Sequence, residues 1–139
     1  MDNQRQLEEV SIEICETFDV YAPPVPIELM LQKPPEGMWA EVDVSQLSGS
    51  FLNIKERYSP RMSLSRLLVR HIAASDWGKD RNLDRLLGDS DGIGAFARML
   101  LMPEDMVNGL TSGARNPKTM SMHFEVPEED ARLRLLELL

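Results

Sequence analysis

The chain has 139 residues, enough for one domain with a hydrophobic core but short for two, so we predict a single domain over residues 1–139. Its net charge of −8 at pH 7 argues against non-specific nucleic-acid binding, which needs Lys and Arg to neutralise phosphates. A basic protein partner, or simple solubility, fits this charge better.

Membrane and export signals are also missing from the sequence. No apolar run approaches the ~20 residues that span a bilayer. The first residues, MDNQRQLEEV, are polar and lack the apolar core of a signal peptide. Cys15 is the single cysteine, so no disulfide can form within the chain; it lies among apolar helical residues and is expected to be buried. We therefore expect a cytoplasmic protein with no membrane partner.

The first third of the chain predicts two helices. Apolar residues recur every three or four positions between Gln4 and Asp19, which indicates one helical face. YAPPVP ends this helix because paired prolines cannot continue it. Pro26 can open a short second helix, PIELMLQK, since proline suits the first turn.

Two strand-like runs follow, MWAEVDV at 38–44 and SGSFLNI at 48–54. Apolar and polar residues alternate imperfectly in the first run, and a short connection separates the two. This pattern predicts an antiparallel hairpin.

The remainder predicts helices. The longest, SPRMSLSRLLVRHIAAS at 59–75, has Ser63 or Ser65 to cap its start and is broken by SDWGKD. Further helices are predicted at 80–87, 90–102, 103–110, 118–126 and 127–139. The expected fold class is α+β, with at least five helices and a small antiparallel sheet.

Four segments carry a further signal: PPVPIELMLQ, SGSFLNIKERYSPRMSLSRLLVRH, GAFARMLLMPEDMV and MSMHFEVPEEDARLRLLEL. In wording and order they resemble the ImmA/IrrE metallo-endopeptidase family over nearly the whole chain, with FARMLLMP the most specific piece. The resemblance implies a compact, mostly helical zincin-like domain with a small antiparallel sheet. Members commonly use zinc and cut, or help remove, helix-turn-helix repressors, typically in phages, mobile elements and stress responses.

The family's HExxH helix allows a residue-by-residue test. Two histidines one turn apart bind zinc, and the Glu between them activates the metal's water. Aligning RLLVRH with the family's lead-in places HIAAS on this motif. His71 is then retained, Ile72 replaces the base, and Ser75 replaces the second ligand.

The third ligand of the family is a Glu shortly before the FA of FARMLLMP. The aligned position here is at or near Ser90, and Asp89 or Asp91 could substitute only with a shift of register. With the base missing and one ligand clearly kept, we do not expect peptidase activity of the family's type.

A minimal alternative metal site would combine His71 and His123 with Asp76 or Asp91, although nothing in their spacing demands it. His71, Asp91 and His123 are thus weak metal candidates. Five methionines could line an adaptable partner-binding groove or fill a core that has few aromatics: Met99, Met102, Met106, Met120 and Met122.

Three functional hypotheses follow. The first is a catalytically degenerate ImmA/IrrE-like domain that acts as a regulatory protein-binding module towards a helix-turn-helix transcription regulator, with no cofactor. The second is an active zinc-dependent endopeptidase that cleaves a repressor with relocated ligands. The third is a structural or toxin–antitoxin-like interaction subunit that copurifies with a constant partner.

Overall fold

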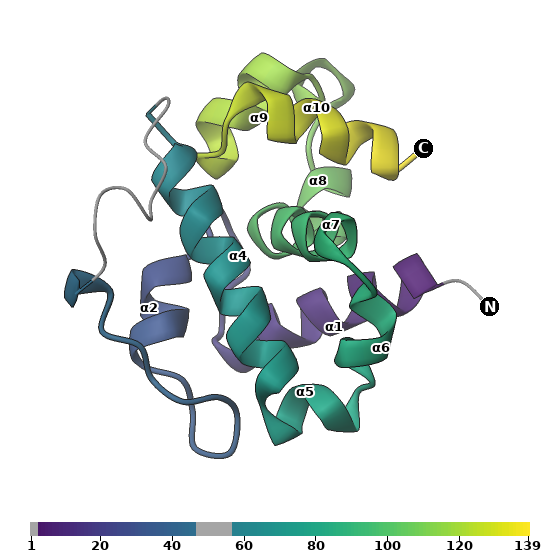
Figure 1. Ribbon diagram of the computed structural model, residues 1–139. Coiled ribbons are helices and arrows are strands. Elements are labelled where there is room, and N and C mark those ends of the chain that lie inside the picture. Colours follow the sequence, from purple (N-terminus) through teal and green to yellow (C-terminus); the bar gives the residue numbers. More distant parts are fainter. Residues whose placement is uncertain (1–2, 47–56) are drawn as a thin grey trace.

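A computed structural model describes residues 3–46 and 57–139 as helices joined by short connections (Figure 1). The α-helices are α1 Asn3–Thr17, α2 Ile27–Gln32, α4 Ser59–Ala74, α5 Asp76–Asp80, α6 Leu83–Leu87, α7 Ser90–Leu101, α8 Glu104–Asn108, α9 Pro117–Phe124 and α10 Glu128–Glu137. Two 3₁₀ helices are η1 Val44–Gln46 and η2 Ser112–Ala114. The helices predicted from apolar spacing are confirmed.

The predicted antiparallel sheet is wrong for the described residues, which contain no strand. The run at 38–44 is irregular and leads into η1. The indole N–H of Trp39 donates to the Met30 carbonyl at 2.9 Å, and the Val42 N–H donates to the Leu31 carbonyl at 2.8 Å. Its apolar residues therefore cover the end of α2 instead of pairing with a strand. The second run, 48–54, lies outside the described residues.

The core is organised around α4, which packs against α7 and α2. Figure 1 shows α9 and α10 together at one end of α4 and α5 at the other. The α4 N-cap is Tyr58, which makes no side-chain capping bond, so the predicted caps Ser63 and Ser65 are wrong. Both serines lie inside the helix and are buried, and the Ser65 hydroxyl donates to the Ala97 carbonyl of α7 at 2.9 Å.

A buried ion pair joins the first and last helices. Arg134 of α10 is 0% exposed and makes two 2.6 Å bonds to the carboxylate of Glu8 on α1. Its Nε also donates to the Met102 carbonyl at the end of α7, at 2.9 Å. Because buried charges are costly unless paired and hydrogen-bonded, this contact fixes α1, α7 and α10 relative to one another.

Arg61 ties the start of α4 to two distant connections. Its guanidinium donates to the Val25 carbonyl at 2.8 Å and to the Glu125 carbonyl at 3.0 Å. The connection between α1 and α2 is thereby held close to the end of α9. This arrangement positions the cavity described below.

Candidate functional site

His71 lies in the last turn of α4 and is partly exposed. The described part of the chain gives its imidazole no hydrogen-bond or ion-pair partner. A metal-ligating histidine normally donates its second ring nitrogen to a carboxylate or carbonyl, which fixes the ring. His71 lacks this support.

Ile72 occupies the position aligned with the family's catalytic base, and its side chain is fully buried in the core. The following helix approaches its backbone very closely. A Cβ added at Gly78 of α5 would lie 2.0 Å from the Ile72 carbonyl oxygen. Only glycine at 78 allows α5 to lie so close to the end of α4.

Ser75 occupies the position aligned with the second ligand and connects α4 to α5. Its hydroxyl donates to the Ile72 carbonyl at 2.6 Å and accepts from the Gly78 N–H at 3.0 Å. Ser75 is therefore the N-cap of α5. The segment SDWGKD, predicted to break the helix, does end α4 and itself forms this short helix. The hydroxyl thus holds α4 and α5 together both as a donor and as an acceptor.

The residues near the expected third ligand form the start of α7. Asp89 is its N-cap, and Oδ1 accepts from the Asp91 and Gly92 N–H groups at 3.0 and 3.2 Å. Ser90 and Asp91 are exposed in the first turn, and Asp76 is exposed at the start of α5. Within 3–46 and 57–139, no group of three or more His, Cys, Asp or Glu side chains could hold a metal, so His71, Asp91 and His123 are not brought together.

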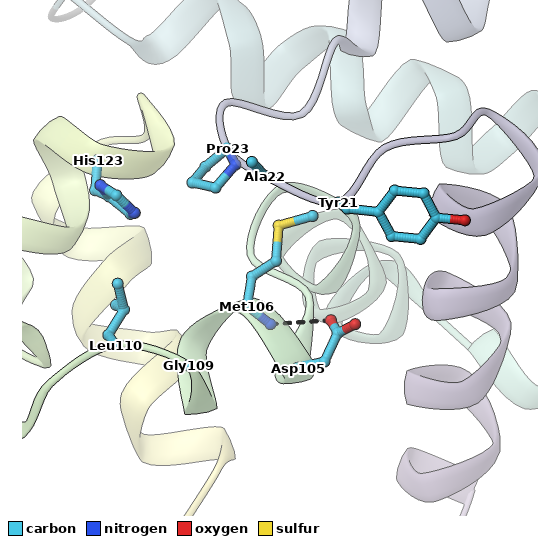
Figure 2. Close-up of a pocket in the computed structure, with 8 residues that line it drawn as sticks. All are labelled: Tyr21, Ala22, Pro23, Asp105, Met106, Gly109, Leu110 and His123. Atoms are coloured by element: carbon cyan, nitrogen blue, oxygen red, sulfur yellow. Dashed lines mark hydrogen bonds between the residues drawn. The ribbon is translucent and has the colours of Figure 1, made fainter.

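His123 instead borders an open cavity of about 270 Å³ (Figure 2). The lining comes from the connection after α1, from α8 with the residues that follow it, and from α9: Tyr21, Ala22, Pro23, Asp105, Met106, Gly109, Leu110 and His123. Figure 2 shows Met106 in the middle, with Tyr21 and Asp105 on one side and Leu110 and His123 on the other. The sequence singled out Met106 and His123 but not Tyr21 or Asp105.

The lining of this cavity contains both polar and apolar side chains. The Asp105 carboxylate accepts from the Met106 N–H at 2.9 Å through one oxygen and is exposed. The Tyr21 side chain is 67% exposed. The His123 ring packs edge-on against Phe124, with 5.2 Å between ring centroids.

Two further cavities are lined by other residues. One of about 460 Å³ is lined by Gln32, Glu41, Val42 and Asp43. Another of about 190 Å³ lies between the two ends of the chain and is lined by Gln4, Arg5, Glu8, Glu104, Glu137, Leu138 and Leu139. No residue of α4 lines these cavities or the one beside His123.

Cys15 is buried, as expected. Burial first, and then the negative charges of Asp105 and Glu16, raise the pKa of its thiol to about 12. Because the thiolate is the reactive form, this thiol is not a nucleophile in the folded protein.

The five methionines divide between the two predicted uses. Met99, Met102 and Met120 are buried in the core, whereas Met106 is partly buried and Met122 is 63% exposed. Core filling therefore accounts for three of them, and Met106 lines the cavity beside His123.

Comparisons with known proteins returned no match to a protein-family model, to a curated protein or to a solved structure. The resemblance to the ImmA/IrrE family thus remains a prediction from the sequence. Among the helices of the described residues, none is long and apolar enough to cross a membrane.

Proposed function

We propose that this chain is a regulatory protein-binding domain related to the ImmA/IrrE metallopeptidases, and that its partner is a helix-turn-helix transcription regulator. The observation that carries the proposal is the use of Ile72 as a fully buried core residue and of Ser75 as a helix cap. A peptidase of that family needs a general base and a zinc ligand at these positions. Binding needs neither.

The charge distribution supports a basic partner surface. Within the described ranges, ion pairs with carboxylates involve six arginines: Arg5, Arg61, Arg81, Arg98, Arg132 and Arg134. Exposed acids remain at many places on the helices, including Asp76, Asp84 and Asp105. With a net charge of −8, this surface would complement the DNA-binding face of a regulator and speed association.

The proposal places this interaction in the cytoplasm. The regulator would be found there, and the single free cysteine, which is buried, suits a reducing compartment. Direct contact with nucleic acid or membrane is not part of the proposed function.

The test uses a helix-turn-helix regulator encoded next to the gene for this chain. Both proteins are purified without chelators, mixed with and without added zinc, and followed by calorimetry and intact-mass spectrometry. We expect a complex of fixed stoichiometry that weakens with salt and leaves the regulator uncut. Absence of any complex would overturn the proposal.

The zinc peptidase hypothesis predicts a different result. It requires about one zinc per chain by elemental analysis, loss of that zinc in His71→Ala, and zinc-dependent cleavage of the regulator. Under the binding proposal, His71→Ala leaves the affinity for the regulator and the melting temperature in chelator unchanged. Cleavage that depends on His71 would replace the proposed function with the peptidase.

A further inference from the structure

We propose that the cavity beside His123 binds one basic side chain, an arginine or a lysine, that projects from a protein partner. This inference rests on the proposed function in taking the partner to be a protein. It goes further by placing the docking site at Tyr21, Asp105 and Met106, away from α4, and by naming the chemical group that enters.

The walls of the cavity are held by contacts outside it. Arg61 joins the backbone at Val25 and Glu125, which places the Tyr21–Pro23 wall near the α9 wall. Arg5 of α1 makes a two-bond pair with Glu104 at the start of α8, with N–O distances of 2.8 and 3.1 Å. Because the walls are already positioned, binding need not order them, and this lowers its entropic cost.

The lining suits a cation on an apolar stem. Asp105 uses one carboxylate oxygen for the Met106 N–H, and a carboxylate has about four acceptor sites, so it can still accept from a guanidinium or ammonium. The exposed Tyr21 ring offers a face on which a cation can stack. Met106 provides an adaptable apolar contact for the methylene stem.

The volume favours a single side chain. Pockets that enclose drug-sized ligands hold about 300–1,000 Å³, and this cavity of about 270 Å³ falls below that range and is open. A long basic side chain can fill it while the backbone of the partner remains at the surface. The exposed side chain of Tyr21, which lines the cavity, then gives the partner additional apolar contact.

The nearby charges set where the cation lies. Asp105 is an exposed carboxylate on the same side of Met106 as Tyr21 (Figure 2). On the other side, the guanidinium of Arg115 donates to the carbonyls of Asn108 and Leu110. A basic group is therefore attracted to the Asp105 side, and an anionic ligand is repelled from it.

The test titrates the intact protein with a short arginine-rich peptide while NMR follows backbone amides and methionine methyl groups. A matched peptide has citrulline in place of arginine, which removes the charge and keeps the shape. We expect saturable shifts centred on Tyr21, Asp105 and Met106 with the first peptide. The citrulline peptide should bind at least about tenfold more weakly, the loss expected for one charged hydrogen-bonding group.

The chain offers a matched pair of variants. Asp105 and Asp84 are each the second residue of a five-residue helix, are exposed, and accept the N–H of the next residue at 2.9 and 3.0 Å. Asp105→Asn should weaken the arginine peptide about tenfold, whereas Asp84→Asn should change its affinity less than about twofold. Tyr21→Leu should weaken it about two- to fivefold through loss of the aromatic face.

Three results would overturn the inference: equal effects of the two Asn variants, shifts centred elsewhere, or no saturable shift. The proposed function can fail separately. If the regulator binds and Asp105→Asn leaves its affinity unchanged, the cavity assignment is wrong and the binding function stands. If the peptide binds at the cavity but the regulator forms no complex, the regulator is the wrong partner and recognition of a basic side chain stands.

Discussion

The surroundings of His71 and of His123 use their polar groups in opposite ways. Beside His71, the Ser75 hydroxyl bonds both Ile72 and Gly78, and the Ile72 side chain lies fully in the core. Beside His123, the Asp105 carboxylate is exposed, with a backbone N–H as its bonded partner. The polar groups beside His71 hold the fold together, whereas the carboxylate beside His123 is exposed, and we propose that it binds a partner.

The buried Glu8–Arg134 pair is the extreme case of polar groups committed to folding. We expect substitutions in this pair to cause a larger loss of stability than substitutions beside His71 or His123. The expected loss of stability decreases from substitutions in this pair to substitutions of Ser75, and is smallest for Asp105.

Arg134→Met should give the largest effect. The substitution removes both bonds to Glu8 and the bond to the Met102 carbonyl, and leaves the Glu8 carboxylate buried without its partner. Breaking a buried pair from one side costs about 3–5 kcal/mol in the free energy of unfolding. Urea denaturation followed by circular dichroism measures this loss.

The double variant Glu8→Leu with Arg134→Met is the control. Replacing both members of a buried pair by apolar residues is often nearly neutral, so the double variant should regain most of the stability lost in Arg134→Met. The single variant Glu8→Leu completes the cycle. If the losses of stability in Glu8→Leu and Arg134→Met simply add in the double variant, the bond to Met102 or the packing of Arg134 matters more than the ion pair.

Ser75→Ala should have an intermediate effect. It removes the N-cap of α5, and loss of such a cap typically costs about 1 kcal/mol. Ser75→Asp keeps an acceptor for the Gly78 N–H and should stay within about 0.5 kcal/mol of the parent. Thermal and urea unfolding of the two variants test the assignment, and a neutral Ser75→Ala would show that the serine is not a structural replacement for a ligand.

The helices could be predicted because their signals are local. Apolar residues three and four positions apart on α1 and α7 face the core, and prolines or glycines mark several of the ends. The strand predicted at 38–44 is wrong because partly alternating apolar residues occur both in half-buried strands and in irregular segments that cover a helix. Trp39 and Val42 are separated by Ala40 and Glu41, so the alternation is imperfect, and both bond to carbonyls at the end of α2 instead of to a strand.

Contacts between distant segments could not be predicted in this way. Arg134 lies three residues after Ala131, on the buried face of α10, but its partner Glu8 is 126 positions away. Ser65 was predicted as a cap because serine favours caps, and its acceptor on α7 is invisible in the local sequence. The cavity beside His123 joins segments from three parts of the chain, so Tyr21 and Asp105 carry no motif.

Asp105→Asn should have the smallest effect on stability, which separates a binding group from a structural one. The side chain is exposed, and the Asn oxygen can still accept the Met106 N–H, so the free energy of unfolding should change by less than about 0.5 kcal/mol, as for Asp84→Asn. Urea denaturation of both variants measures the difference. A loss of about 1 kcal/mol or more in Asp105→Asn alone, as large as a lost helix cap, would place Asp105 with Ser75 among the groups that hold the fold. Unchanged stability together with a tenfold weaker arginine peptide would establish that its charge serves recognition.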